Sequence, residues 1–338
     1  MELQLKNIGM IKEANVKLDG LTVIAGENDT GKSTLGKSLY FQLRFLLDLK
    51  KIKIRKKENK HLNIGEARRS TILPKLIFDE QINNGEINLI IDNINHNFII
   101  NDGDIEDEND FKNNLADNIR MPIMIETPLV WNFNKFFNQM SIIESQAGIF
   151  GDELSIDYPF LLKDLHFRLS VGSTKRAYHI EDKIFHLING KLQKDNFGNF
   201  YFEKDNKKIS LLNTATGIKY FGIFQVLSQN NYLNENTVLV LDEPEVHLHP
   251  KWQLEMAKII VELVKNGVKI VINSHSPYMI DALKYYADKS KVNNNFYLAE
   301  KNSNETSTIN DVTMDISPIF EKLTEPLRKL RKMKLGLK

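Results

Sequence analysis

Short apolar runs separated by turn residues open the sequence. Three runs of strand length lie within residues 2–25, with Gly9 and Asp19-Gly20 between them. From Thr34 to about Leu49, apolar residues return every three or four positions, which is typical of one face of a helix. The N-terminal part therefore predicts three strands, a polar loop and a helix. The predicted strands are 3–8, 14–18 and 21–25.

A regular alternation of strands and helices returns from Ala215 onward. Short apolar runs alternate there with longer segments of helical spacing. Such alternation predicts a parallel α/β sheet whose two faces are covered by helices. The predicted helices are 217–228, 251–265 and 277–283, and the predicted strands are 238–241, 268–272 and 295–298.

The middle of the chain has a mixed pattern. A hairpin, an acidic loop, a further strand and a long helical stretch are expected there, followed by a polar hairpin that turns at 196–199. The tail from Asp315 has helical spacing and ends in basic residues. The sequence shows neither an internal repeat nor a long heptad run. The remaining predicted elements are the hairpin 86–91 and 97–100, the loop 101–110, the strand 122–126 and helices within 129–188.

Composition narrows the class of protein without naming a function. The 338 residues include 42% hydrophobic and 26% charged residues, and the formal net charge is +1. Such a composition is ordinary for a globular protein, and the whole-chain charge favours neither nucleic acid nor membrane. The chain has no cysteine, which excludes disulfides, thiol nucleophiles and thiolate zinc sites.

The sequence pattern favours a cytoplasmic protein. The N-terminus lacks the basic and apolar regions of a secretory signal. The longest apolar runs, such as 237–241, have strand length and fall short of the about 18 residues that span a bilayer. We therefore expect no membrane partner.

Residues 26–33 form a complete phosphate-binding motif. They match G-x-x-x-x-G-K-[ST], and they follow an apolar strand and precede a helix, as the motif requires. The backbone would wrap a phosphate, Lys32 would reach the β- and γ-phosphates, and Ser33 would ligate Mg²⁺. The sequence therefore predicts ATP and Mg²⁺ as cofactors. The candidate nucleotide-binding residues are Gly26, Glu27, Asn28, Asp29, Thr30, Gly31, Lys32, Ser33 and Thr34.

Two further strand ends carry candidate catalytic groups. An apolar run at 237–241 is followed by Asp242 and Glu243, which would hold Mg²⁺ and act as general base, respectively. The next strand ends at Asn273-Ser274, so His275 should project over the same edge of the sheet. There its ring could hydrogen-bond the γ-phosphate or the attacking water.

These segments together resemble a known family. GENDTGKST, VLVLDEPEVHLHP and INSHSPYMI are similar to motifs of ABC-type ATPases of the SMC, RecF and OLD branch, often named AAA family ATPases. The resemblance covers residues 1–45 and 205–285. It implies an α/β P-loop ATPase head: N-terminal antiparallel strands, a parallel sheet flanked by helices, and an inserted, mainly helical lobe. The expected layout is a core at 1–49 and 206–300, a lobe at 50–205 and a basic helical tail at 301–338.

The resemblance also implies a homodimer in which two heads enclose two ATP molecules. Each site would borrow a signature segment from the partner, and Asn213–Lys219 is the candidate. It departs from the usual L-S-x-G pattern, because Ala215 takes the serine position; a slow ATPase is therefore expected. His247 and His249 would belong to the dimer-contacting loop and lack a third ligand for zinc. The candidate residues in trans are Thr214, Thr216, Gly217 and Lys219.

Several alternatives stay open at this stage. Gln139 and Gln146 are both candidates for the glutamine that links nucleotide to lobe. A transporter ATPase subunit shares the head chemistry, but its usual signature is missing here. The chain has no N-K-x-D sequence, which argues against a GTPase. A ring ATPase with an arginine finger stays open. Asp102-Gly-Asp104 lies in an acidic run that most simply predicts a solvated loop, and too few residues follow the switch helix for a Toprim domain.

The resemblance therefore implies an output through a partner. Similar short ATPases occur in bacterial anti-phage systems of the Septu-like or PARIS-like kind, paired with a separately encoded nuclease or toxin. A RecF-like DNA-repair ATPase is the alternative. Two basic clusters could contact DNA, although solvated helix ends explain them equally well, and an apolar side of the tail could dock on a neighbouring subunit. The clusters are Lys50, Lys51, Lys53, Arg55, Lys56 and Lys57, and Arg328, Lys329, Arg331, Lys332 and Lys334; the apolar side is Leu327, Leu330, Met333 and Leu337.

Overall fold

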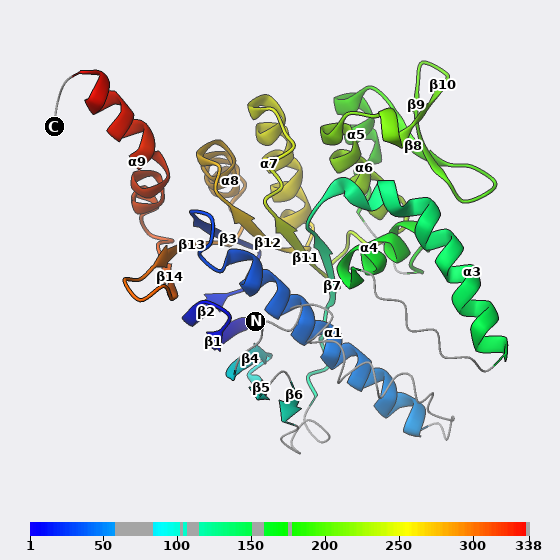
Figure 1. The fold of residues 1–338 in the computed structure, drawn as a ribbon, viewed down its shortest axis with the longest axis horizontal. Coiled ribbons are helices and arrows are strands. Elements are labelled where there is room, and N and C mark those ends of the chain that lie inside the picture. Colours follow the sequence, from blue (N-terminus) through cyan, green and yellow to red (C-terminus); the bar gives the residue numbers. More distant parts are fainter. Residues whose placement is uncertain (58–83, 102–103, 107–114, 151–158, 175–177, 336–338) are drawn as a thin grey trace. The chain divides into compact units, whose positions relative to one another are not determined.

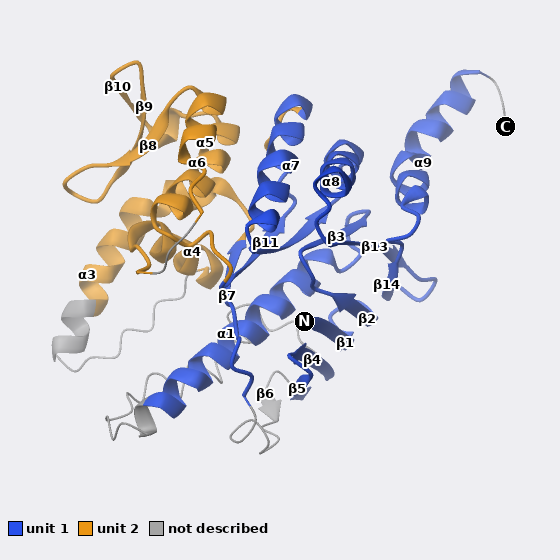
Figure 2. Ribbon diagram, turned by 180° about the vertical axis from the view of Figure 1, so that it is seen from behind, with its two compact units in different colours: residues 1–124, 236–245, 250–338 blue, residues 125–235, 246–249 orange. Residues whose placement is uncertain are grey.

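The chain folds into two compact units (Figure 2). A computed structural model describes all residues except 58–83, 102–103, 107–114, 151–158, 175–177 and 336–338. It leaves the side chains at 55–57, 104–106 and 145–150 undescribed. Unit 1 comprises residues 1–124, 236–245 and 250–338, and unit 2 comprises residues 125–235 and 246–249.

Unit 1 is built on a large mixed sheet (Figure 1). In the described part of the chain this sheet has eleven strands, in the order β6-β5-β4-β1-β2-β14-β13-β3-β12-β11-β7. The strands are β1 Glu2–Ile8, β2 Ile11–Lys17, β3 Leu21–Gly26, β4 Gly85–Ile91, β5 Ile94–Asn101, β6 Asp104–Glu106, β7 Met121–Ile125, β11 Thr237–Asp242, β12 Lys269–Ser274, β13 Asn294–Lys301 and β14 Ser307–Asp311.

One half of this sheet is parallel and buried on both faces. Strand β3 pairs in parallel with β12 on one side and β13 on the other, and β12 pairs in parallel with β11. All six residues of β3 are buried, and so are the first five of β11. Continuous burial is what a parallel sheet covered by helices requires. The other half, from β6 to β2, is antiparallel.

Helices of unit 1 cover this sheet. Figure 1 shows α1 running across its strands, with apolar side chains at Leu35, Leu39, Leu43 and Leu46 fully buried. Phe45 of α1 meets Phe98 of β5 edge to face, with ring centroids 4.9 Å apart, a geometry that stabilises aromatic pairs. The helix therefore packs on both the parallel and the antiparallel strands. The unit 1 helices are α1 Lys32–Lys57, α7 Pro250–Lys265, α8 Pro277–Ser290 and α9 Ser317–Lys334.

Unit 2 is mainly helical. Its small sheet has the order β10-β9-β8, and a turn at 195–199 joins β8 to β9, as the sequence predicted. Leu192 of β8 is buried, and its backbone N–H donates to Gln225 Oε1 at 2.8 Å, which ties the sheet to helix α6. The elements are η2 Pro128–Phe133, α3 Asn134–Phe150, α4 Phe160–Ser170, α5 Glu181–Ile188, β8 Lys191–Lys194, β9 Phe200–Lys204, β10 Lys207–Ser210, η3 Leu211–Asn213 and α6 Thr216–Gln229.

The unit boundaries correct the expected domain layout. The hairpin β4–β5, assigned from sequence to the inserted lobe at 50–205, extends the main sheet of unit 1 by pairing β4 with β1. Residues 206–235, assigned to the core, belong to unit 2. The pattern of a hairpin fixes its own turn and its apolar face, but it does not say which sheet edge the hairpin joins. Here Leu89 and Phe98 are fully buried on the face that α1 covers.

Two other segments differ from expectation. Within the predicted acidic loop 101–110, residues Asp104–Glu106 form strand β6 on β5, while Asp102 lies outside the described residues. The expected tail at 301–338 contributes strand β14 to the main sheet before helix α9 begins at Ser317. β14 pairs with β13 and β2, so this part of the tail belongs to the core of unit 1.

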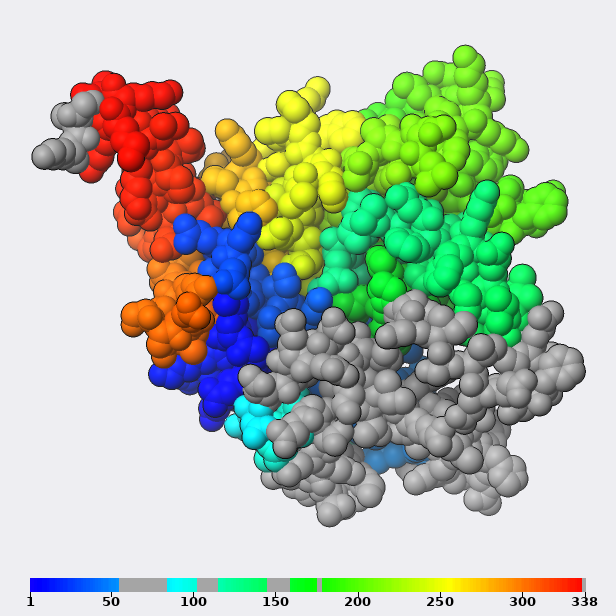
Figure 3. All heavy atoms as spheres, in the orientation of Figure 1, coloured from blue at the N-terminus to red at the C-terminus, as the bar shows by residue number. Residues whose placement is uncertain are grey.

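The last helix is exposed over much of its length. Residues 326–334 of α9 and the following Leu335 are solvent-exposed, and Figure 3 shows this helix in red on the visible face. Leu327, Leu330 and Met333 are exposed apolar residues there, and Leu337 lies outside the described residues. Among the helices that the structure describes, none combines the length and apolar composition needed to cross a membrane.

Candidate functional site

The sheet order places three motif segments at neighbouring strand ends. β12 lies between β3 and β11, and all three strands run in the same direction. The register aligns Ser274 with Ala25 and Asn273 with Asp242. Because parallel strands end at the same edge, the loops that follow β3, β11 and β12 emerge side by side. The segments expected to form one site therefore meet in unit 1.

The loop after β3 has the conformation that a phosphate cradle needs. Gly31 adopts φ +83°, and a Cβ there would lie 2.7 Å from Ile11 Cγ1, so only glycine fits without strain. The Thr30 hydroxyl donates to Glu27 O at 2.8 Å and braces the loop. Helix α1 begins directly afterwards, and its first backbone N–H groups have no acceptor within the helix. This end of α1 therefore attracts an anion.

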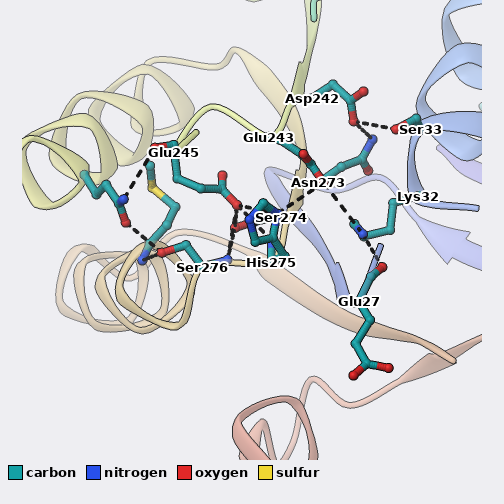
Figure 4. Close-up of polar contacts among 12 residues, drawn as sticks. Glu27, Lys32, Ser33, Asp242, Glu243, Glu245, Asn273, Ser274, His275 and Ser276 are labelled. Atoms are coloured by element: carbon teal, nitrogen blue, oxygen red, sulfur yellow. Dashed lines mark hydrogen bonds and ion pairs between the residues drawn. The ribbon is translucent and has the colours of Figure 1, made fainter. Parts of the chain in front are cut away.

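Lys32 is held at the centre of the site. Its side chain is buried, Nζ donates to Glu27 O at 2.6 Å, and Nζ lies 3.9 Å from Glu243 Oε1 (Figure 4). Burial lowers the pKa of Lys32, and the carboxylates of Glu243 and Asp242 oppose that shift. A buried ammonium between the loop and the end of β11 fits a group with several negative charges, as a triphosphate has.

The remaining loop residues lie at the surface or along α1. Glu27, Asn28 and Asp29 are exposed. Asp29 forms an ion pair with Lys301 at 2.6 Å, and the Glu27 carboxylate lies 3.6 Å from Lys322 Nζ of α9. Thr34 is half-buried in the first turn of α1, and Gly26 is buried at the end of β3.

Ser33 and Asp242 present oxygen atoms to the same place. The Ser33 hydroxyl donates to Asp242 Oδ1 at 3.0 Å, and Asn273 Nδ2 donates to the same oxygen at 2.9 Å (Figure 4). Hydroxyl and carboxylate oxygens are the hard ligands that Mg²⁺ prefers, together with water and phosphate oxygens. The residues present therefore fit a magnesium ion bound beside the phosphate cradle.

Glu243 and His275 form a pair at this edge. His275 Nδ1 lies 3.2 Å from Glu243 Oε1, and both side chains are about one third exposed, at 38% and 31%. Glu243 adopts φ +45°, an uncommon value for a residue with a side chain, and its backbone N–H donates to Asn273 O at 2.9 Å. A carboxylate that faces both a lysine and water has the position that a general base requires.

Two residues of this site were not singled out from the sequence. Asn273 orients the Asp242 carboxylate, and Glu245 is a buried carboxylate that contacts the segment around His275. Both lie within the motif segments at 238–250 and 272–280, so the sequence showed where they are but not which groups they contact. Polar residues inside or directly after a buried strand are a usable signal, because burial demands a hydrogen-bond partner.

The candidate signature residues lie in unit 2. Helix α6 begins at Thr216 after Ala215, and no side chain caps its N-terminus. The Thr214 hydroxyl donates to Ser210 O at 3.0 Å, whereas Thr216 is exposed. Gly217 and Lys219 are buried; Lys219 Nζ donates to Asn132 Oδ1 at 3.2 Å, and burial lowers the pKa of Lys219. The Thr214 hydroxyl is therefore engaged within unit 2.

The remaining candidates lie on helices or in the loop between β11 and α7. Gln139 is exposed on α3, and the side chain of Gln146 is not among those described. His247 and His249 are exposed, and no group of three possible metal ligands occurs within the described residues. Of the first basic cluster, Lys50 donates to Asp117 O and Lys51 pairs with Asp48, while the side chains of 55–57 are not described. The second cluster is exposed on α9.

One curated relative, the "Retron Ec83 probable ATPase" of Escherichia coli, is 28% identical over 131 residues. The match covers 35% of this chain and 24% of that protein, so the chain corresponds to about a quarter of the relative's length.

One solved structure shows the same fold. The Smc head bound to the C-terminal winged-helix domain of ScpA has a TM-score of 0.51 at 14% identity, with 94% of this chain and 98% of that chain covered. An Smc head from Pyrococcus furiosus with an extended coiled coil gives 0.49 at 13% identity, over 98% of each chain. At such identity the likeness concerns the fold, which is that of a P-loop ATPase head of the ABC type.

Residues 21–281 match a family described as "AAA domain, putative AbiEii toxin, Type IV TA system". The matched range begins at β3 and ends within α8, so it contains the loop at 26–33, Asp242, Glu243 and His275. With most of its length matched, the chain belongs to this family of AAA-type ATPases.

Proposed function

We propose that this chain binds Mg²⁺ and ATP at the edge formed by β3, β11 and β12, and hydrolyses the ATP. The observation that carries the proposal is the contact between Ser33 Oγ and Asp242 Oδ1, because it joins the two halves of an Mg²⁺–phosphate site across 209 residues of sequence. The buried ammonium of Lys32 next to this contact supports a polyanionic ligand.

Each residue of the site would have a distinct task. Bound Mg²⁺ would neutralise negative charge on the phosphate oxygens of ATP and so favour attack of water on the γ-phosphorus. Ser33 and Asp242 would hold the metal, and Lys32 would bind phosphate oxygens. Glu243 would take a proton from the attacking water, because its carboxylate is accessible and faces the same centre. His275 would hydrogen-bond the γ-phosphate or that water.

The second part of the proposal concerns assembly. Two copies of this chain would enclose two ATP molecules, and the start of α6 in each copy would contact the nucleotide of the other. The uncapped N-terminus of α6 supports this role, because its free backbone N–H groups and the exposed Thr216 can bind phosphate oxygens. A signature without its usual serine would give a slow or partner-stimulated ATPase.

The third part concerns output. ATP-driven closure of the dimer would control a separately encoded effector, a nuclease or toxin, in an anti-phage system of the bacterial cytoplasm. The partial similarity to a retron ATPase and the toxin-linked description of the family support this context. A RecF-like DNA-repair ATPase is the second candidate, and the exposed basic residues of α9 favour it.

One experiment separates these parts. The tagged chain would be purified from its native host with and without ATP, and its ATP binding, ATP turnover, mass in solution and co-purifying partners would be measured. ATP-dependent recovery of a nuclease or toxin supports the defence role. Salt-dependent DNA binding without such a partner supports the repair role. If the pure chain fails to bind Mg²⁺–ATP, the entire proposal is wrong.

A further inference from the structure

Glu245 is a buried carboxylate placed beside the candidate active site. It is the third residue after Asp242 and is 4% exposed. Its Oε1 accepts three hydrogen bonds: from the Ser274 hydroxyl at 2.7 Å, from the backbone N–H of His275 at 2.8 Å and from that of Ser276 at 3.1 Å (Figure 4). One oxygen atom thus binds three consecutive residues.

The hydrogen bonds to Glu245 hold the chain at the end of β12. The ladder between β11 and β12 ends at the pair Asp242 and Asn273, and the ladder between β3 and β12 ends at the pair Ala25 and Ser274, so regular strand pairing does not orient His275 and Ser276. Glu245 binds this next segment, residues 274–276, before helix α8 begins at Pro277. Burial raises the pKa of Glu245, and the hydrogen bond from Ser274 is the largest of the contacts that oppose this rise. The three donors therefore stabilise a carboxylate that burial alone would destabilise.

A second layer of contacts fixes Glu245 and its segment. The Ser276 hydroxyl donates to Gln253 Oε1 of α7 at 2.7 Å, and it accepts from Met279 N at 3.4 Å as the cap of α8. Gln253 Nε2 in turn lies 3.5 Å from Glu245 O. The segment at 274–276 is thus connected to the starts of two helices. Such a network leaves few other conformations for the backbone of His275.

The ring of His275 is held between two carboxylates. Its Nδ1 lies 3.2 Å from Glu243 Oε1 and 3.6 Å from Glu245 Oε1, yet it makes no hydrogen bond of good geometry to any described residue. Glu245 Oε2 is likewise buried without a partner in the described part of the chain. Unpartnered buried polar atoms are costly and need a reason. A His275 ring that is held in place to bind the γ-phosphate or the attacking water of the proposed reaction would be such a reason.

We propose that Glu245 is a positioning residue that fixes the backbone at 274–276 and thereby holds the imidazole of His275 beside Glu243. Its kinetic consequence rests on the proposed ATPase function, whereas its structural consequence does not. Glu245 does not touch the reacting atoms in this scheme; it acts through His275. The inference thus assigns to Glu245 a role different from those of Asp242 and Glu243.

The structural test uses hydrogen exchange in the nucleotide-free protein. In Glu245→Ala we expect the amides of His275 and Ser276 to lose protection by roughly tenfold or more, because hydrogen bonds to a charged acceptor are removed. Glu245→Gln should lose less, since its carbonyl oxygen can accept the same bonds. Asp281→Asn, an exposed change on α8, is the matched control and should leave protection unchanged. Unchanged protection in Glu245→Ala overturns the inference.

Two further readouts separate positioning from simple stabilisation. Glu245→Ala should shift the NMR resonances of the His275 ring and lower kcat for ATP with little change in KM, and Glu245→Gln should restore much of kcat. Lost protection with an unchanged ring signal and unchanged kcat overturns the inference. If Glu245→Ala does not fold, Glu245→Asp replaces it, because the shorter side chain withdraws the carboxylate from its donors. If the wild-type chain shows no ATP turnover, only the proposed function is contradicted. Hydrogen exchange and the His275 ring resonances then still test the positioning role of Glu245.

Discussion

The Ser33 hydroxyl donates a hydrogen bond to the Asp242 carboxylate at 3.0 Å, although 209 residues separate them. The contact follows from strand order: β3 and β11 flank β12, so the residues after them project at one edge of the sheet. Asn273 of β12 donates to the same carboxylate oxygen and sets its orientation. The two oxygen atoms proposed as magnesium ligands are therefore brought together by the fold before any ion binds.

Replacement of Lys32 should separate nucleotide binding from stability. We expect Lys32→Met to weaken ATP binding by roughly tenfold to a hundredfold, because a charged hydrogen-bond donor to phosphate is lost. Without nucleotide, the variant should be at least as stable as wild type near neutral pH. Burial lowers the pKa of Lys32, so the charged side chain is less favourable in the folded than in the unfolded chain. This destabilisation is present at neutral pH and is lost only as pH rises through the folded pKa.

Thermal unfolding with and without Mg²⁺–ATP measures both effects of Lys32→Met. Lys265→Met, at the exposed end of α7, is the control and should keep the wild-type rise of Tm with ATP. An equal ATP-induced rise in Lys32→Met would show that Lys32 does not bind the phosphates.

Replacement of Glu243 should spare binding and stop hydrolysis. We expect Glu243→Gln to bind ATP normally while kcat falls by roughly a hundredfold to ten-thousandfold, because the amide cannot accept the proton from water. The uncleaved nucleotide should then hold the closed dimer, which light scattering after size-exclusion chromatography detects. Glu255→Gln on α7 is the control. Hydrolysis by Glu243→Gln at the wild-type rate would show that Glu243 is not the base.

A change at Gly217 tests whether the signature segment acts in trans. We expect Gly217→Glu to bind ATP as a monomer but to lose hydrolysis, because a carboxylate at the start of α6 repels the phosphate of the partner's nucleotide. Mixing this variant with Lys32→Met should restore activity, since one site of the mixed dimer then has an intact loop and an intact signature. No recovery on mixing, or equal loss of binding and hydrolysis, contradicts a role in trans.

The sequence located the segments that form the candidate site because each of its motifs is local. The loop at 26–33 has glycines, lysine and serine in fixed order, and Asp242 ends an apolar run, so each element and its place at a strand end could be inferred. The strands and helices after Ala215 agree with prediction within a few residues for most of their ends. The exceptions are α8, which was expected to end at Leu283 and extends to Ser290, and β14, which was not predicted.

Relations between distant segments were harder to predict. The pattern at 86–100 showed a hairpin, but its pairing with β1 depends on the free edge that β1 offers. Glu245 was overlooked because a glutamate in a motif resembles a solvated one until its three donors are known. Long-range hydrogen bonds leave no periodic trace in sequence, so only the structure locates them.

The conformation of Gly31 predicts that any side chain at this position lowers the free energy of unfolding. We expect Gly31→Ala to lower the free energy of unfolding by roughly 1–3 kcal/mol, because φ is +83° and the new Cβ would lie 2.7 Å from Ile11 Cγ1. Gly172→Ala is the matched control, since the nearest atom to its Cβ would be 3.9 Å away. Urea unfolding of both variants measures the difference. Equal stability of the two variants would contradict strain at Gly31.

Unit 2 contains a buried histidine that should make stability depend on pH. Burial, and to a lesser degree the charge of Lys194, lowers the pKa of His166 to about 4; its Nε2 lies 2.9 Å from Asn134 Oδ1. Between pH 6.5 and about 4 the unfolded chain binds a proton at His166 that the folded chain does not. The stability present above pH 6.5 is therefore lost as pH falls, by of order 3 kcal/mol. His166→Gln should remove this part of the pH dependence, and exposed His186→Gln is its control. Urea unfolding from pH 7.5 to 4 measures it, and parallel curves for wild type and His166→Gln would contradict a neutral, buried His166.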